Sequence, residues 1–377
     1  MIVNEEINYE FGSTDGGDET GFNDPVSTAY KGNIAYYLAR ESLQNIIDAK
    51  DPSLAGPALA KFSVITVPSN NLPDHEKLKK IFIACRDYYS GNADCVRFFK
   101  KAIGKLENNE KIKLLKISDY NTTGLTGDDA EQSGNYYAFL KAVGSSSKTG
   151  GKGGSFGLGK GALFNASSFK MLYVRSVFDN KCVFQGKLRL VSHLWNGDQK
   201  QGNGSYGKPH QKPIREEKEI PELFRRKEQG TDIFIVDFDD SDKWADQIGR
   251  SVLDNFWCAI LKKLLIVDIN GVVINADNLE EYMNLYFPSG KTDINEESGP
   301  LPYFYTYTRT SVIQGNLPTL GHVNFYIQLN KSYPKRVACI RKNGMVIEHK
   351  RFDFISGYAG VFVCEDDKGN EILRKME

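Results

Sequence analysis

The chain has 377 residues, a length that favours two domains over one. Its 48 Lys and Arg residues balance 48 Asp and Glu residues, so bulk positive charge cannot hold it on nucleic acid, and any polyanion contact must be a local patch. No apolar run reaches the ~18 residues of a membrane helix. The acidic N-terminus lacks the basic and apolar parts of a secretory signal, so we expect a globular, cytoplasmic protein with no membrane contact.

The N-terminal part is expected to contain an arm, a helix and a strand. Residues 1–27 are acidic and rich in glycine and are predicted to form an arm outside the core. From about 28 to 50, apolar residues recur at helical spacing, and Asp51 and Pro52 end the helix. Residues 61–67 have the alternating, β-branched pattern of a strand.

A helical stretch follows at about 74–103, with a break expected near Gly91. Residues 111–118 predict a buried strand that ends at Asp119. The next segment, 121–161, is polar and dense in glycine. A loop of this length inside a compact domain is typically a functional lid or a disordered insert.

Further strands precede a second domain. The expected elements are a helix start at 160–169, strands at 170–178, 182–190 and 231–238, and a mixed-charge helix within 196–230. A boundary near residue 240 is followed by a helix at 244–264. Asn270-Gly271 and Asn343-Gly344 each predict a type I′ hairpin turn, because both central residues of that turn need positive φ.

Three polar side chains lie on one face of the first predicted helix. Glu41, Asn45 and Asp48 stand at i, i+4 and i+7, in the middle of an otherwise apolar helix. A carboxylate there could polarise a water, and an amide oxygen could coordinate a hard cation such as Mg²⁺. The alternative is a solvated helix face.

A carboxylate and a glycine turn follow the buried strand. Asp119 leaves that strand five residues before Gly124, and a carboxylate in this position can accept a hydrogen bond from the exocyclic amine of a base. A plain turn is the alternative interpretation.

The third candidate segment is the glycine-rich run from Gly153 to Ala162. Its glycines allow the backbone to approach phosphates, and the following helix points its N-terminal amides toward them. Lys160 could add a positive charge. The run does not match the P-loop, since Gly161 follows the lysine, and a flexible linker is the alternative.

Taken in this order, the segments resemble the motifs of the GHKL ATPase superfamily, which includes DNA gyrase B, the ninety-kilodalton heat-shock chaperone, MutL and MORC. Residues 41–49 match the box ExxxNxxDA, residues 154–161 resemble the second glycine box, and Gly230-Thr231 resembles the late GT element.

The middle box of the family, DxGxG, is matched in part. Asp119 stands at its first position, but Asn121 occupies a usual glycine position and Gly124 comes one residue late. The departure concerns the loop conformation near the base and leaves the role of Asp119 unaffected.

The resemblance implies an α+β fold: a GHKL (Bergerat) α/β sandwich ATPase domain at 28–240, with a lid at about 126–153 that closes over ATP, and a smaller mixed α/β domain at 241–377. It also implies that Glu41 is the general base, Asn45 the Mg²⁺ ligand, Asp119 the adenine anchor and Asp48 a supporting residue. The implied nucleotide-binding residues near the phosphates and the base are Gly124, Gly154, Gly157, Leu158, Gly159, Lys160, Gly161 and Thr231.

The second domain resembles the transducer domain of the gyrase B, MutL and MORC branch, where a loop lysine reaches the γ-phosphate. Lys342 is the candidate, and a solvent-facing hairpin lysine is the alternative. Residues 331–351 carry seven Lys and Arg against the single acid Glu348, which could contact a DNA backbone.

The leading hypothesis is an ATP-hydrolysing switch that forms a homodimer clamp on nucleotide binding, with a role in restriction or antiphage defence suggested by analogy. DNA or an effector protein is the expected further partner. The alternatives are an ATP-sensing scaffold without turnover and a DNA-binding protein with an incidental nucleotide pocket.

Overall fold

The structure of the chain is a computed structural model that describes residues 6–22, 33–128, 134–141, 160–241, 243–288, 299–353 and 357–374. These residues form two compact units, each assembled from separate stretches of sequence. Unit 1 contains the described residues of 6–34, 62–141 and 160–241, and unit 2 contains those of 35–61 and 243–374. The units change near the expected boundary at 240, but residues 35–61, which carry the first predicted helix, belong to unit 2.

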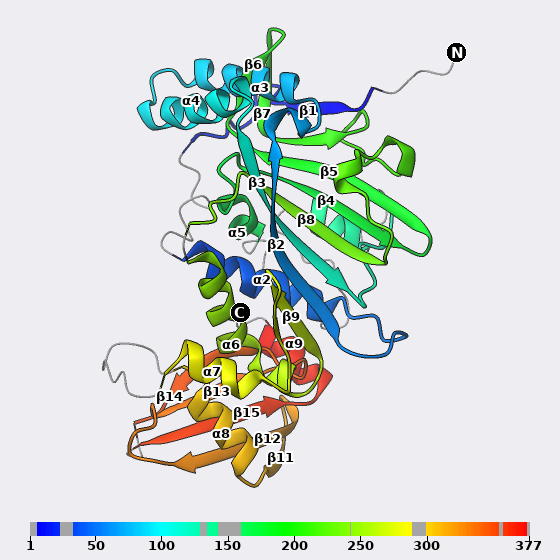
Figure 1. Cartoon of the computed structure of the whole chain (residues 1–377). Coiled ribbons are helices and arrows are strands. Elements are labelled where there is room, and N and C mark those ends of the chain that lie inside the picture. The colour runs from blue at the N-terminus through cyan, green and yellow to red at the C-terminus, as the bar shows by residue number, and fades with distance from the viewer. Residues whose placement is uncertain are drawn as a thin grey trace. The chain divides into compact units, whose positions relative to one another are not determined.

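A largely antiparallel sheet forms the centre of unit 1 (Figure 1). In spatial order its strands are β1 (Asn8–Ser13), β7 (Asp198–Gly207), β5 (Lys181–Arg189), β4 (Met171–Phe178), β8 (Gly230–Val236), β3 (Lys111–Tyr120) and β2 (Ala58–Pro68), and β6 (His193–Trp195) pairs with β7. The register places Ser118 opposite Asp232 and Ser176 opposite Thr231. Side chains far apart in the sequence therefore meet on three adjacent strands, β3, β8 and β4.

The expected N-terminal arm is wrong for residues 8–13, which form strand β1. Tyr9 and Phe11 are buried at 3% and 8% exposure, and β1 pairs with β7 at the edge of the sheet. Although the composition around the strand is acidic and rich in glycine, aromatic and polar residues alternate within the strand. Burial of two large aromatic side chains outweighs that composition.

The mixed-charge helix expected within 196–230 is also wrong. The chain there forms β7 and two short 3₁₀ turns, η3 (Glu217–Glu219) and η4 (Glu222–Phe224). Strand β7 has no hydrophobic alternation, and its glycines serve close packing: a Cβ on Gly204 would lie 2.4 Å from the ring of Phe11. The strand forms because β1 and β5 pair with it on either side, although its own sequence does not predict a strand.

The helical stretch at 74–103 is confirmed as two helices, α3 (His75–Tyr88) and α4 (Ala93–Glu107), which lie together in Figure 1. Each begins at a capping side chain: Asp74 accepts from the backbone amide of Lys77, and Asn92 from that of Cys95. The apolar faces of both helices are buried in the core of unit 1.

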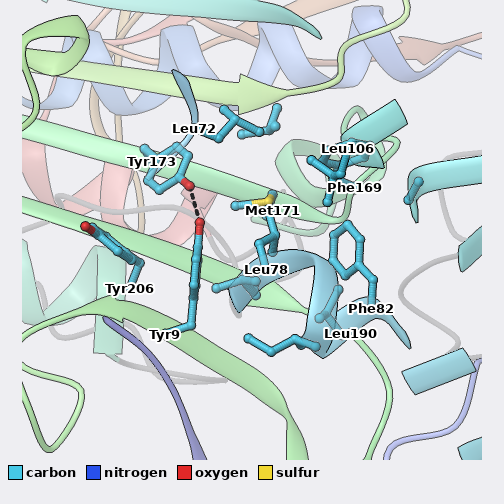
Figure 2. Packing of buried hydrophobic residues seen from close by; sticks show 14 of the residues in the cluster. Tyr9, Leu72, Leu78, Phe82, Leu106, Phe169, Met171, Tyr173, Leu190 and Tyr206 are labelled. Atoms are coloured by element: carbon cyan, nitrogen blue, oxygen red, sulfur yellow. Dashed lines mark hydrogen bonds between the residues drawn. The ribbon is translucent and has the colours of Figure 1, made fainter. Parts of the chain in front are cut away.

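That core contains many aromatic side chains. Figure 2 shows Tyr9 and Tyr173 pointing toward each other, with their hydroxyl oxygens 2.5 Å apart. The Tyr9 hydroxyl also lies 2.8 Å from the carbonyl oxygen of Pro73, to which it donates. Burial raises the pKa of both tyrosines far above the ordinary range, so both hydroxyls are neutral and serve as hydrogen-bonding groups inside an apolar cluster.

Unit 2 combines helices with a second sheet, whose strand order is β11-β12-β15-β13-β14. Its helices are α2 (Ile34–Asp48), α6 (Trp244–Leu261), α7 (Leu279–Tyr286), α8 (Leu301–Arg309) and α9 (Asp367–Arg374). Its strands are β9 (Leu265–Ile269), β10 (Val272–Ile274), β11 (Ile313–Leu317), β12 (Gly321–Leu329), β13 (Arg336–Ile340), β14 (Val346–Arg351) and β15 (Tyr358–Cys364). The mixed α and β content predicted for this part of the chain is confirmed.

The two Asn-Gly pairs behave differently. Asn270 (φ 51°) and Gly271 (φ 93°) both have positive φ and join β9 to β10, as predicted. At the second pair the predicted hairpin is confirmed, since β13 and β14 pair antiparallel, but the type I′ turn is wrong, because the strands are joined by five residues and Asn343 does not have positive φ. Gly344 is needed there because a Cβ would lie 2.5 Å from the backbone of Ala259 in α6.

Helix α2 belongs to unit 2, where its polar groups contact later parts of the chain. Arg40 Nη2 lies 3.3 Å from the carbonyl oxygen of Ile347 in β14, and Ser251 of α6 donates to the carbonyl oxygen of Tyr36 at 2.8 Å. The α+β fold class is confirmed by the helices and sheets of both units. Within the described residues, every helix is too short or too polar to cross a bilayer.

Candidate functional site

The predicted glycine-rich run is described only at its end. Gly154, Gly157, Leu158 and Gly159 lie outside the described residues, as does most of the expected lid. Lys160 begins helix α5 (Lys160–Asn165), and Gly161 is buried in its first turn. The described part of the lid includes η2 (Tyr137–Lys141), a short π-helical turn.

The other unit 1 candidates converge on Asp119. This residue lies near the end of β3 and is 8% exposed. Its Oδ1 accepts hydrogen bonds from the Thr122 hydroxyl at 2.5 Å and from the backbone amide of Thr231 at 2.7 Å. Sequence reasoning had placed Asp119 and Thr231 in one site, and the register of β3 and β8 brings them into direct contact.

The second oxygen of Asp119 is left for another donor. Both hydrogen bonds reach Oδ1, and no residue in the described part of the chain donates to Oδ2. Burial raises the pKa of Asp119 from 3.8 to about 6, while the Thr122 hydroxyl, Arg226 and the Thr231 amide lower it. The carboxylate is therefore ionised at neutral pH, and its Oδ2 suits a ligand that carries an N–H donor.

Gly230 allows this close approach. It has φ +127°, and a Cβ at this position would lie 2.5 Å from the carbonyl oxygen of Asp119 and 2.6 Å from Oδ1. The GT element of the sequence thus has a steric reason: the glycine makes room, and the amide of the next residue donates to the carboxylate.

The loop after Asp119 turns through two left-handed residues. Asn121 has φ 60° and Gly124 has φ 67°, and asparagine adopts this region more readily than most residues. A Cβ on Gly124 would lie 2.7 Å from the carbonyl oxygen of Val177. Asn121 therefore has a left-handed backbone conformation, which glycine adopts without a steric penalty and asparagine tolerates.

Ser176 of β4, which sequence reasoning missed, connects the loop to the GT element. Its hydroxyl donates to the carbonyl oxygen of Gly230 at 2.8 Å, lies 3.1 Å from the Thr231 hydroxyl, and accepts from the amide of Leu125 at 2.9 Å. No local motif marks this serine, since its role comes from strand register alone.

Arg226 is the second residue that the sequence did not indicate. It donates to the backbone carbonyl oxygen of Asp119 and forms an ion pair with Asp232 of β8. Its guanidinium lies over the ring of Tyr120, 4.6 Å from the centroid. In the sequence, a cation a few residues before Gly230-Thr231 is only a weak indication of such a contact. The direction in which its side chain points depends on the turn that precedes β8.

In unit 2, the polar face of α2 is half-buried, so the helix does not present a fully solvated stripe there. Asn45 Nδ2 donates to the backbone oxygen of Glu41 at 3.0 Å and to its carboxylate at 3.3 Å. Because a carboxylate can only accept, the atom of Asn45 facing it must be the nitrogen. The amide oxygen of Asn45 is then the atom that could coordinate a cation.

Asp48 is anchored by the loop between β13 and β14. Its Oδ1 accepts from Asn343 Nδ2 at 3.1 Å and lies 3.9 Å from Arg341 Nη2. The side chains of Asp48 and Arg341 are 5% and 4% exposed. Within unit 2, the structure thus gives Asp48 a role in packing α2 against this loop, and the two loop residues involved are the neighbours of the predicted Lys342.

Lys342 itself contacts helix α9. Its Nζ lies 2.8 Å from Asp367 of α9, and its backbone amide donates to Asn370 Oδ1 at 2.8 Å. Both partners of the lysine ion pair are solvent-exposed. A contact between Lys342 and a γ-phosphate remains a prediction.

The basic stretch at 331–351 is less cationic than its composition suggests. Arg341 is buried and faces Asp48, and Lys342, Lys350 and Arg351 form ion pairs with Asp367, Glu348 and Asp353. These ion pairs consume much of the local charge excess on which a DNA contact would depend.

Unit 2 also contains an apolar pocket of about 550 Å³, distant in sequence from every predicted site residue except Lys342. Its walls come from β12–β15 and α9, and include Phe325, Val337, Phe362 and Ile372. No group of three or more His, Cys, Asp or Glu side chains suited to a metal ion occurs among the described residues.

No protein-family model matches the chain, and no curated protein is significantly similar to it in sequence. Solved structures that resemble it include the ATPase region of Saccharomyces cerevisiae topoisomerase II, alone (TM-score 0.38) and bound to ICRF-187, dexrazoxane (TM-score 0.37). Each is 10% identical and is matched over 87% of this chain and 73% of the other. At these scores the likeness decides nothing about chemistry.

Proposed function

We propose that the protein is a Mg²⁺-dependent, ATP-binding and ATP-hydrolysing switch of the GHKL type. The observation that carries the proposal is the buried Asp119 carboxylate, whose Oδ1 is held by Thr122 and Thr231 while Oδ2 receives no hydrogen bond from the described residues. The adenine amine supplies the matching N–H donor, and Gly230 supports the site by leaving it open.

The polar face of α2 would act on the phosphate end. Magnesium bound with ATP supplies charge neutralisation at the phosphate oxygens. Asn45 would hold that ion through its amide oxygen, the orientation of which is supported by the hydrogen bonds to Glu41. Glu41 would accept a proton from the attacking water. Asp48 supports the helix through Asn343 and Arg341.

The remaining assignments extend the same proposal. Backbone groups of Gly154, Gly157, Leu158, Gly159 and Gly161 would contact the phosphates. Lys160 would add charge, Gly124 would shape the loop beside the base, and Lys342 would approach the γ-phosphate. Nucleotide-dependent homodimerisation, a MutL- or MORC-like branch, and a defence role with DNA or an effector partner follow by analogy alone.

A scaffold that binds ATP without turnover is the second candidate. The hydrogen bond between Asn45 Nδ2 and the Glu41 carboxylate favours it, because it occupies one of the two oxygens with which a general base could accept a proton. A base can exchange this bond for a water when substrate binds, so turnover separates the two candidates.

The test compares Glu41→Gln with Glu281→Gln, a matched change at an exposed helix position of unit 2. ATP binding is measured by calorimetry and phosphate release in single-turnover mixing. We expect Glu41→Gln to bind ATP normally and to lose at least ~100-fold in phosphate release, while Glu281→Gln retains both. Equal phosphate release by both variants would show that Glu41 is not the base, and no ATP uptake by the wild type would overturn the whole proposal.

A further inference from the structure

Arg226 is one of the few charged side chains enclosed in unit 1. Its side chain is 2% exposed, and an arginine is rarely buried unless every donor is satisfied. Nε donates to the carbonyl oxygen of Glu228 at 2.8 Å, and Nη2 donates to that of Gln229 at 3.1 Å as well as to that of Asp119. The guanidinium therefore links the turn before β8 to the end of β3.

The ion pair with Asp232 does not by itself explain this burial. Nη1 of Arg226 lies 2.5 Å from Asp232 Oδ1, but Oδ2 of the same carboxylate is already paired with Lys116 Nζ at 3.0 Å. Asp232 therefore faces two cations, Lys116 and Arg226, although one of them would balance its charge. A second carboxylate is needed to balance the second positive charge. Asp119 is the nearby acid, since Arg226 donates to its backbone carbonyl oxygen.

The formal charges of the cluster support this pairing. Lys116 and Arg226 are cations, and Asp232 and Asp119 are the acids beside them. The group is neutral when both carboxylates are ionised and carries a net positive charge when Asp119 is protonated. An uncompensated charge is costly in a buried position, so the cluster favours the ionised Asp119.

We propose that Arg226 is a positioning residue that keeps the Asp119 carboxylate ionised and fixed in place, so that Oδ2 acts purely as a hydrogen-bond acceptor at neutral pH. The inference rests on the proposed function, in which that acceptor receives the adenine amine. A protonated Asp119 would present its own O–H donor, and two donors facing each other form no hydrogen bond.

The groups that face Asp119 come from three elements. Thr122 in the loop after β3 and the Thr231 amide in β8 donate to it, Arg226 from the preceding turn lowers its pKa, and Asp232 opposes them by raising it. Burial has the largest effect on the pKa of Asp119, and it raises that pKa. Without Arg226 the upward influences lose their main charged opponent, so the pKa of Asp119 should rise from about 6 toward neutrality.

The experiment uses Arg226→Met and Arg226→Lys in the full chain, with Arg225→Met as the matched control. Arg225 is exposed, and its Nε bonds to the carbonyl oxygen of Ile220. The titration of Asp119 is followed by carboxyl ¹³C NMR without nucleotide, and Mg-ATP affinity is measured from about pH 5 to pH 8.5.

We expect the wild type and Arg225→Met to lose ATP affinity as the pH falls through about 6. For Arg226→Met the NMR midpoint and the affinity midpoint should move together, upward by about one pH unit or more. Arg226→Lys keeps the charge and should shift less. This ordering is not expected of a residue that only stabilises the fold.

An unchanged Asp119 midpoint in Arg226→Met, or a loss of affinity that is equal at every pH, would overturn the proposal. If Arg226→Met does not fold, Arg226→Lys and Lys116→Met decide it, since removal of the Lys116 charge should shift the midpoint upward by less than removal of Arg226. If the wild type binds no ATP at any pH, the proposed function fails, while the NMR titration still decides the role of Arg226.

Discussion

The neighbourhood of Asp119 in unit 1 and the polar face of α2 in unit 2 are built in opposite ways. Asp119 is 8% exposed and is held by the backbone amide of Thr231 in β8, the Thr122 hydroxyl and the buried Arg226. Glu41 and Asn45 are half-buried and contact each other within one helical turn. The first region is held by tertiary contacts, and the second by helix geometry.

Under the proposed function, this difference would suit two separate tasks, base recognition and phosphate chemistry. A site that binds a flat base gains affinity when its hydrogen-bond acceptors are already ordered, because binding then carries no entropic cost for ordering them. Groups that coordinate an ion and move a proton must exchange partners during a reaction, so partial exposure suits them. Five substitutions test how each region is held and what it binds.

The largest effect is expected at Gly230. Gly230→Ala forces a Cβ to within 2.5 Å of Arg226 Nη2 and of the Asp119 carbonyl oxygen, at a backbone φ of +127°. We expect a loss of about 2–4 kcal/mol in the free energy of unfolding, measured with urea. Gly91→Ala is the control, since a Cβ there meets nothing within 4 Å; similar stability of both variants would mean that the Asp119 region is loosely packed.

Asp119→Asn should separate affinity from stability. We expect ATP affinity to fall about 100-fold, because the amide cannot offer the same charged acceptor. The pKa of Asp119 is raised from 3.8 to about 6 in the folded chain, so its contribution to stability is present below about pH 4 and is lost as the pH rises through about 6.

Asparagine removes that pH-dependent loss and still accepts from Thr122 and Thr231. Asp119→Asn should therefore be more stable than the wild type by about 1–3 kcal/mol at pH 7 and similar to it at pH 4. Thermal unfolding at the two pH values checks this. A variant less stable than the wild type at pH 7 would show that burial of the ionised carboxylate does not destabilise the folded chain.

Asn45→Ala should act through the metal. We expect ATP affinity to fall about tenfold with Mg²⁺ present and to change little with EDTA, because under the proposed function the lost atom would be a cation ligand. Asn284→Ala is the matched control: Asn284 Nδ2 donates to the backbone oxygen of Glu280 at 2.8 Å, the bond that Asn45 makes to Glu41 at 3.0 Å. An equal effect with and without Mg²⁺ would assign Asn45 to helix structure.

Asp48→Asn tests how firmly α2 is held in unit 2. It removes the carboxylate that faces the buried Arg341 guanidinium and keeps an oxygen for Asn343. We expect a loss of about 1–2 kcal/mol in the free energy of unfolding, less than for a close buried ion pair because the charges are 3.9 Å apart. Chemical denaturation measures it, and no loss would mean that the pair does not hold the helix.

The smallest stability effect is expected for Lys342→Ala. Its ion pair with Asp367 is exposed on both sides, so the free energy of unfolding should change by less than about 0.5 kcal/mol. A fall in phosphate release without a fall in stability would support a place for Lys342 near the γ-phosphate. Unchanged phosphate release would leave it as a surface lysine.

Much of the fold is predictable where local pattern and tertiary structure agree. The helices at 75–88 and 93–107 follow from capping residues and apolar faces, and strands β3, β4, β5 and β8 follow from their apolar runs. Strands β1 and β7 were missed because glycine and polar residues dominate them. Their stability comes from partner strands and from contacts such as Gly204 against Phe11.

The sequence alone determined the residue types of the candidate site: a carboxylate after a buried strand, a Gly-Thr pair, and a Glu, Asn and Asp on one helix face. These patterns are local, because the spacing of a helix or the end of a strand sets them. Only the tertiary structure shows that Arg226 contacts Asp119, that Ser176 contacts Gly230 and Thr231, and that Arg341 rather than Lys342 faces Asp48. Strand register and loop direction bring those residues together from distant parts of the chain, and neither leaves a signal in the neighbouring sequence.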